Sequence, residues 1–134
     1  MSVLVLDTNV VSLIFKKAEP LCSIYESKVK GHRLVISSMT LAELKLWPLR
    51  NHWGTARTEI LQMHLKRYYT VHPPDDDVCS LWAEIRHRSF DEGHAISTED
   101  AWIAATAISL GAPLVTNNPE DFSMVVGLEI LTAR

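Results

Sequence analysis

The chain has 134 residues, of which 47% are hydrophobic and 22% are charged. At this length folding buries about two-thirds of the surface that the unfolded chain exposes, so a core can form without disulfides or structural metals. The five glycines and six prolines form no biased tract, which excludes collagen-like and low-complexity classes. We therefore expect residues 1–134 to form one ordered domain.

The apolar runs are too short for a membrane span or a secretory signal. The run at 3–6 ends at Asp7 without a basic segment before it, and none reaches the roughly 20 residues that a span needs. Cys22 and Cys79 form no Cys-x-x-Cys pattern, so we expect neither a zinc site nor a disulfide framework. The sequence predicts a soluble, cytoplasmic protein.

Short apolar runs alternate with helical patterns along the chain. In chain order they predict a strand at 2–6, helices at 10–18 and 21–30, a strand at 34–36, helices at 40–46 and 55–68, a strand at 70–72, helices at 75–88 and 97–110, a strand at 113–115, a helical turn at 119–122 and a strand at 129–131. Pro48 is expected to limit the helix at 40–46. This alternation predicts an α/β domain with a central, mainly parallel sheet of four or five strands flanked by helices.

Charge is distributed unevenly along the chain. Residues 28–67 carry eight Lys and Arg against two acids, whereas residues 68–134 carry three against eleven. A polyanion such as RNA could use the basic segment, because phosphate contacts supply most non-specific affinity for nucleic acid. The alternative is that these side chains only solvate exposed helices.

Four acidic residues are expected at the carboxyl edge of the sheet. Asp7 directly follows the first strand, and Asp121 lies past the end of a later one. Glu43 and Asp100 lie in the first turns of helices that follow the same edge, and Glu43 shares an inward stripe with Met39, Leu46 and Trp47. Four such acids would repel one another unless a cation neutralised them. An all-oxygen set suits Mg²⁺ or Mn²⁺ rather than zinc.

Each acid also has an ordinary explanation. Asp7, Asp100 and Asp121 can cap or favour the start of a helix, and Glu43 can form a capping box with Thr40. The sequence alone does not decide between these helix-capping roles and metal binding.

Neutral polar residues lie beside these acids in the sequence. Thr8, Thr116 and Asn118 would add oxygens and donors to the same site, or serve turn and cap chemistry. Trp47 and Trp102 could stack a base, but packing is the commoner role of such rings. We assign these two rings and the histidines no role.

Four segments resemble the motifs of PIN-domain ribonucleases, specifically the VapC-type toxins of toxin–antitoxin pairs. They are VLDTN at 5–9, SSMTLAEL at 37–44, DAWIAATA at 100–107 and LVTNNPEDF at 114–122. Order and spacing match over nearly the full chain. In two places the chain departs from the pattern: Asn118 stands where some members carry an acid, and the segment 127–131 lacks the acid-Trp ending of many relatives.

The resemblance implies a PIN-like fold and a Mg²⁺-dependent endoribonuclease that acts as the toxin of a type II toxin–antitoxin system. Asp7, Glu43 and Asp100 would hold the metal, with Mn²⁺ as a possible substitute. Asp121 would help to hold a second ion or a water. The resemblance also implies a homodimer and a small DNA-binding antitoxin that covers the site, giving a larger hetero-oligomer.

RNA is the substrate that the resemblance implies, and Lys45 and Arg50 would hold its flanking phosphates. Two other functions stay open. A catalytically weak PIN-like interaction module would keep the fold without turnover. A phospho-aspartate phosphatase or receiver domain also places an Asp after its first strand, but its usual second acid is replaced here by Asn9. No dinucleotide, P-loop or serine-hydrolase motif occurs.

Overall fold

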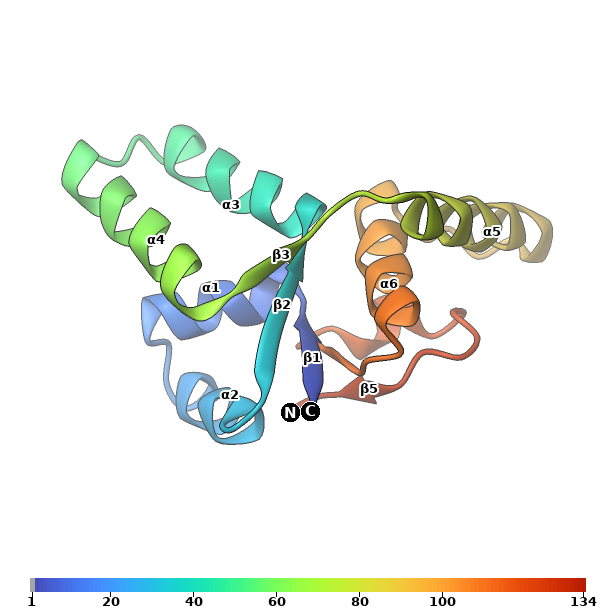
Figure 1. Ribbon diagram of the computed structural model, residues 1–134, viewed down its shortest axis with the longest axis horizontal. Helices are drawn as coiled ribbons and strands as arrows, with labels where there is room; N and C mark the ends of the chain where they lie inside the picture. The colour runs from blue at the N-terminus through green and yellow to red at the C-terminus, as the bar shows by residue number, and fades with distance from the viewer. Residues whose placement is uncertain (1) are drawn as a thin grey trace.

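A computed structural model describes residues 2–134 and contains a five-stranded sheet with helices on both faces (Figure 1). In chain order the elements are β1 (Val3–Leu6), α1 (Thr8–Lys16), α2 (Leu21–Val29), β2 (Arg33–Ser37), α3 (Ser38–Arg50), α4 (Thr55–Tyr68), β3 (Thr70–His72), α5 (Asp76–Glu92), α6 (Thr98–Leu110), β4 (Leu114–Val115), the 3-10 turn η1 (Pro119–Phe122) and β5 (Ile130–Leu131). This confirms the predicted α/β architecture.

The five strands are all parallel and lie in the order β3-β2-β1-β4-β5. The central strand β1 pairs through Val5 with Val35 of β2 on one side and with Leu114 of β4 on the other. Along the chain, β2 and β3 are therefore added on one side of β1, and β4 and β5 are added later on the other side. Such a switch point leaves a crevice at the carboxyl ends of the central strands, where open parallel sheets bind their ligands.

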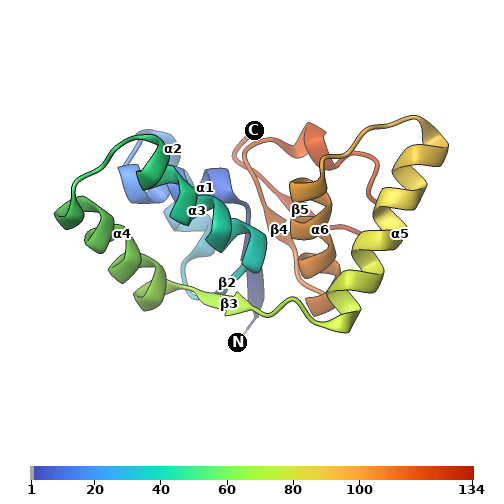
Figure 2. The ribbon, with the colours of Figure 1, turned by 90° about the horizontal axis from the view of Figure 1, so that it is seen from above.

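Alternate side chains of β1 divide the core into two clusters. Val3 and Val5 pack with residues of α5 and α6, whereas Leu4 and Leu6 pack with residues of α1 to α4. Figures 1 and 2 show these two groups of helices on opposite sides of the sheet. Because successive side chains of a strand point to opposite faces, a continuous apolar run is what two buried faces require.

Helix α6 packs directly on the sheet and places Asp100 at its carboxyl edge. Ala101 and Ala104 are fully buried, and the helix contacts both β1 and β2. The Ser97 hydroxyl caps the helix by accepting a hydrogen bond from the Asp100 N–H (3.0 Å). This cap fixes Asp100 in the first turn, next to the end of β1.

Helix α3 is longer than the sequence predicted. It begins at Ser38 and continues through Pro48 to Arg50, whereas we expected 40–46 with a limit at Pro48. Proline lacks the N–H of a helical hydrogen bond, but Pro48 is buried in the packing of α3. The Asn51 N–H donates to the Trp47 carbonyl (3.1 Å), so the helical bonding resumes beyond the proline.

Helix α5 also extends past its predicted end. It runs to Glu92 rather than 88, and Gly93 then adopts the left-handed conformation (φ +70°) that commonly ends a helix. Within residues 2–134, no helix has both the length and the apolar character needed to cross a membrane.

Candidate active site

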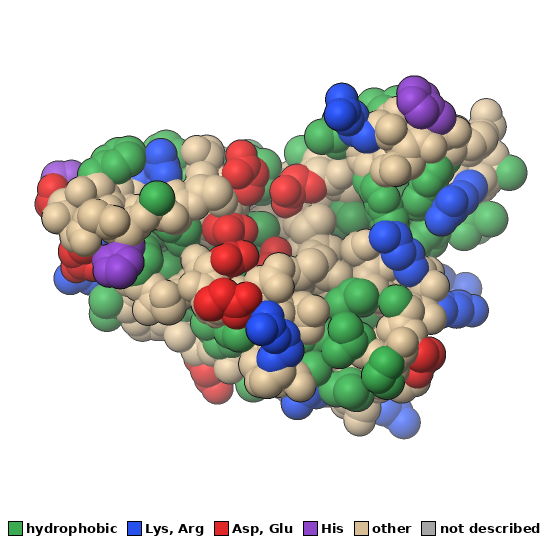
Figure 3. Space-filling model, turned by 180° about the vertical axis from the view of Figure 1, so that it is seen from behind, with side chains coloured by type: hydrophobic (Ala, Val, Ile, Leu, Met, Phe, Trp, Pro, Cys, Tyr) green, Lys and Arg blue, Asp and Glu red, His purple; other side chains and the backbone are tan. Residues whose placement is uncertain are grey.

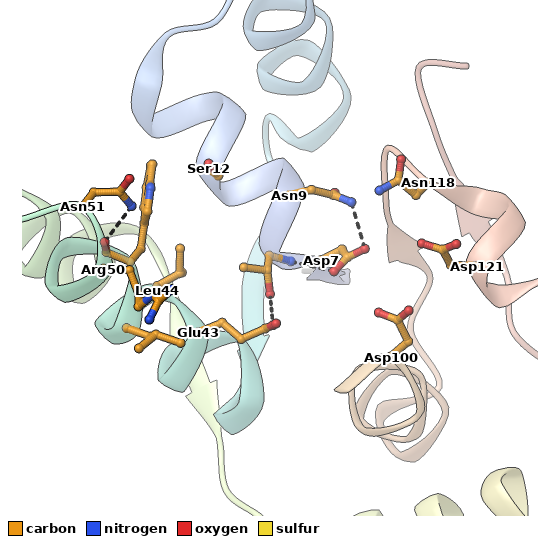
Figure 4. Close-up of a pocket in the computed structure, with 13 residues that line it drawn as sticks. Asp7, Asn9, Ser12, Glu43, Leu44, Arg50, Asn51, Asp100, Asn118 and Asp121 are labelled. Carbon is orange, nitrogen blue, oxygen red and sulfur yellow. Dashed lines mark hydrogen bonds between the residues drawn. The ribbon is translucent and has the colours of Figure 1, made fainter. Parts of the chain in front are cut away.

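A cavity of about 520 Å³ opens at the carboxyl ends of β1 and β4. The four predicted acids Asp7, Glu43, Asp100 and Asp121 all line it, although they come from distant parts of the sequence. Acidic side chains gather in the recess between the two ends of the molecule (Figure 3), and Figure 4 shows the four carboxylates around one space. The topology thus brings together the residues that the sequence singled out.

Asp7 both caps a helix and lines the cavity. Its Oδ1 accepts from the Thr8 N–H (2.7 Å), which caps α1. Its Oδ2 accepts from the Thr116 hydroxyl (2.8 Å) and from the Asn9 amide (3.2 Å). Because Asp7 is only 5% exposed, these bonds fix the carboxylate at the junction of β1 and β4.

The surroundings of Asp7 and Asp100 disfavour the charged form of their carboxyl groups. The pKa of Asp7 is raised from 3.8 to about 6, mainly by burial and in part by the charges of Asp100 and Glu43, against the opposing hydrogen bond from Thr116. Burial is also the main cause that raises the pKa of Asp100, with the charge of Asp121 adding to it. Within residues 2–134, no Lys, Arg or His forms a salt bridge with any of the four acids. A cation from outside the chain would relieve this repulsion.

Glu43 is held by α1 rather than by its own helix. Its Oε1 accepts a hydrogen bond from the Thr8 hydroxyl (2.7 Å). The expected capping box with Thr40 is wrong, because Ser37 caps α3 and accepts from the Thr40 N–H (2.9 Å). Since the helix starts at Ser38, Glu43 lies beyond the first turn and turns toward α1 instead of back to the cap.

One other expectation for α3, the inward position of Leu46, is not met. Leu46 does not face inward with Glu43 but is 53% exposed at the rim of the cavity. Lys45 donates to the Gln62 side chain of α4 (3.3 Å) and does not line the cavity. Successive helical residues are about 100° apart, so Lys45 lies far round the helix from Glu43, whereas Arg50 returns to the same face and does line the cavity.

The predicted supporting residues lie around the acids. Thr8 lines the cavity beside Asp7, and Asn118 lines it at the end of β4. Thr116 is fully buried, donates to Asp7 and accepts from the Asn118 N–H (3.0 Å). Asp121 follows in η1, where its N–H donates to the Asn118 carbonyl (3.1 Å). These bonds connect the loop after β4 to the end of β1.

Sequence reasoning missed several residues of the cavity wall. Asn9 orients Asp7, and its own Oδ1 accepts from the Asn117 N–H (3.2 Å). Ser12 and Asn51 also line the cavity. Trp47 lines it too, on the stripe that it was expected to share with Glu43, although the sequence assigned it no role.

The donors of this cavity fit a hard divalent cation in type and in charge. As the side chains lie in residues 2–134, no three Asp, Glu, His or Cys groups are close enough together to enclose a metal ion. Mg²⁺ usually binds through one or two carboxylates, keeps several waters and takes phosphate oxygens from its substrate. The carboxylates of this cavity are spread around an open space and form no salt bridge within residues 2–134. This arrangement fits such partly hydrated binding better than a site in which protein atoms surround the ion.

Comparison with known proteins agrees with this geometry. A family model described as "PIN domain" matches residues 4–127. This chain belongs to the PIN-domain family. That membership confirms the resemblance inferred from the four motifs and covers nearly all of the sheet and helices described above.

The relatives of this PIN domain carry VapC names. "Ribonuclease VapC5" of Mycobacterium tuberculosis (strain ATCC 25618 / H37Rv) is 32% identical over 71% of this chain and 70% of its own. "Ribonuclease VapC1" of Haemophilus influenzae (strain R2866) is 26% identical over 92% of both chains. A solved structure described as VapBC-5 of Mycobacterium tuberculosis, a member of the VapBC family of toxin–antitoxin systems, aligns with 26% identity and a TM-score of 0.74, covering 99% of this chain and 100% of that one.

Proposed function

We propose that this PIN-domain protein is a metal-dependent endoribonuclease that hydrolyses RNA phosphodiester bonds as the toxin of a toxin–antitoxin pair. The observation that carries the proposal is the cavity at the switch point of the sheet, where four carboxylates converge and, within residues 2–134, none of them forms a salt bridge. The ribonuclease names of the relatives support RNA as the substrate.

Asp7, Glu43 and Asp100 would hold Mg²⁺, or Mn²⁺ in its place, and Asp121 would help to hold a second ion or a water. The chemistry that such a cation supplies when bound is activation of water and stabilisation of charge on the phosphate. The protein contributes orientation: Thr8 donates to Glu43, so this carboxylate is directed into the cavity before substrate arrives. Preorganised donors of this kind need little rearrangement during reaction.

Thr116 gives Asp7 the same kind of support. Its hydroxyl donates to one oxygen of Asp7 while the Thr8 N–H occupies the other. Oδ1 accepts only one hydrogen bond and so keeps a lone pair for a metal ion, but at 5% exposure Asp7 has little room to approach phosphorus as a nucleophile. This arrangement disfavours a phospho-aspartate mechanism, and we propose direct hydrolysis, in which water adds to phosphorus and the bond to the leaving sugar oxygen breaks.

We propose that the partner is a small DNA-binding antitoxin that covers the cavity, and that the toxin is a homodimer. The solved VapBC-5 relative, described as a toxin–antitoxin system, supports the antitoxin. Exposed apolar side chains on α3 and α4, among them Leu49, Ile60 and Met63, are of the kind that a protein partner covers. Co-expression with the antitoxin and measurement of the mass of the complex tests this part.

The function is tested by incubating the purified protein with a pool of structured RNAs in Mg²⁺, Mn²⁺ or EDTA. We expect discrete cleavage that needs the metal and is lost in the double variant Asp7→Asn/Asp100→Asn. Asp77→Asn is the matched control, because Asp77 is an exposed acid of α5 outside the cavity. Cleavage that continues in EDTA or in the folded double variant contradicts the proposal. Metal and RNA binding without cleavage in a broad pool supports the interaction module instead.

A further inference from the structure

One wall of the cavity carries no acid. It is formed by Ser12 of α1, by Trp47 and Arg50 of α3, and by Asn51, which follows α3. Figure 4 shows Arg50 and Asn51 on the side away from Asp100 and Asp121. Although the cavity holds four carboxylates, Arg50 forms a salt bridge with none of them, nor with any other acid within residues 2–134. Its charge is therefore available to an anion from outside the chain.

Cations and aromatic rings alternate beside this wall. The Lys16 ammonium lies 4.6 Å from the centre of the Trp47 ring, and the Arg57 guanidinium lies 3.8 Å from the centre of the Trp53 ring. The two tryptophan rings are 4.7 Å apart, centre to centre. Grooves that bind single-stranded nucleic acid combine these same two features, a positive charge for the backbone and rings on which bases stack.

We propose that this wall binds one unpaired nucleotide of the RNA next to the scissile phosphate, with its base on Trp47 and its phosphate on Arg50. The proposal rests on the RNA substrate of the proposed function and adds a subsite to it. Lys16 is an exposed side chain, so its ammonium can leave the Trp47 ring and pair with a phosphate when a base arrives. The substrate would have to be single-stranded at this nucleotide, because a base stacked within a helix cannot reach the wall.

Asn51 supplies a polar group at the same place. Its amide nitrogen donates to the Trp47 carbonyl (2.9 Å), which fixes the side chain at the end of α3. The Oδ1 atom is then left as an acceptor for an N–H on the edge of a base. The wall thus offers a ring, an acceptor and a cation to a single nucleotide.

The competing explanation is that these rings only pack the helices together. Trp47 and Trp53 both lie beside Phe15 of α1 (ring centres 6.1 Å apart in each case) and are partly buried against the core. In that case, replacement of Trp47 would disturb the packing of the helices and weaken the binding of every ligand by the same factor. The test must therefore separate recognition of the base from recognition of the backbone.

The probes are an oligoadenylate of eight nucleotides and an oligomer of the same length and backbone without bases. Binding is measured by fluorescence anisotropy in Mg²⁺ with the full chain carrying Asp7→Asn, which we expect to prevent cleavage during the measurement. In this background we expect Trp47→Leu to weaken binding of the oligoadenylate by about 5- to 150-fold, the range of one stacked base, and to leave the base-free oligomer nearly unchanged. Trp82→Leu, which removes a half-buried ring of α5 outside the cavity, is the matched control and should change neither.

Arg50→Gln gives the complementary result. It should weaken both oligomers by the same factor and lower the slope of log Kd against log salt by about 0.7, as expected for one lost phosphate contact on a single strand. Trp47→Phe, which keeps a smaller ring, should lie between the parent and Trp47→Leu and serves if the leucine variant does not fold.

Two results would overturn the subsite: equal weakening of both oligomers by Trp47→Leu, or unchanged binding of both. Failure of the Asp7→Asn parent to bind either oligomer would instead count against the proposed function itself. Thermal unfolding of each variant shows which of them are folded at the assay temperature.

Discussion

Replacement of Asp7 by asparagine is expected to stabilise the metal-free protein at neutral and alkaline pH. The raised pKa of Asp7 means that the folded state binds its proton more tightly than the unfolded state does. The stability that this proton provides is complete below about pH 4 and is lost as the pH rises through about 6. Above that pH the wild-type protein must fold with a buried carboxylate, whereas the variant carries no charge there.

The size of the effect follows from the change in pKa. A rise from 3.8 to about 6 corresponds to about 3 kcal/mol, since each pKa unit is about 1.4 kcal/mol. Asparagine can keep the cap to the Thr8 N–H, but its amide nitrogen cannot accept from Thr116 and Asn9, a loss of about 1–2 kcal/mol. The variant should therefore be more stable than wild type by about 1–2 kcal/mol at pH 8, and less stable by a similar amount at pH 4.

Urea denaturation in EDTA, followed by circular dichroism at pH 4 and pH 8, measures both differences. Addition of Mg²⁺ at pH 8 should then stabilise wild type more than the variant, because a ligand that binds only the folded state adds to its stability. A variant that is less stable than wild type at both pH values by the same amount would refute the assignment of a destabilising buried charge to Asp7.

Three further predictions concern residues that support the cavity. Ser97→Ala removes the cap of α6 and should lower the free energy of unfolding by about 1 kcal/mol; an unchanged urea midpoint would argue against this cap. Tyr25→Phe removes a buried hydroxyl that bonds to the Thr116 carbonyl (3.2 Å) and the Asn117 side chain (2.7 Å), and a loss of about 1–3 kcal/mol is expected in the same assay, whereas equal stability would contradict it. Thr8→Ala releases Glu43 and should slow RNA cleavage, while Thr8→Ser keeps the hydroxyl and most of the rate; equal rates for the two variants would show that the hydroxyl is not needed.

The fold could be predicted from the sequence because its signals are local. The apolar run of β1 and the cap at Asp7 each specify one element, and the alternation of strands with helices specifies the class. The errors lie where tertiary packing decides. Pro48 is buried inside α3, which continues past it, and no local pattern shows that the proline packs against the core.

The four acids of the site could be predicted from their positions after strands and near helix starts. The sequence could not show which of them cap a helix and which line the cavity. Asp7 is a cap and a cavity residue together, whereas Glu43 is not the capping partner of Thr40 that its spacing allowed. Trp47 was passed over because a tryptophan near a core usually packs. The packing of α3 against α1, α6 and β2 is what shows that its ring also reaches the cavity.

The most direct test of the account is the Mn²⁺ concentration that gives half-maximal RNA cleavage, measured for wild type and for Glu43→Gln. If the carboxylates of the cavity hold the cation that RNA hydrolysis needs, wild type is inactive without metal. Glu43→Gln then requires a higher Mn²⁺ concentration or loses cleavage altogether. Cleavage by wild type that does not depend on the metal, or the same half-maximal concentration and rate in both proteins, would contradict the account.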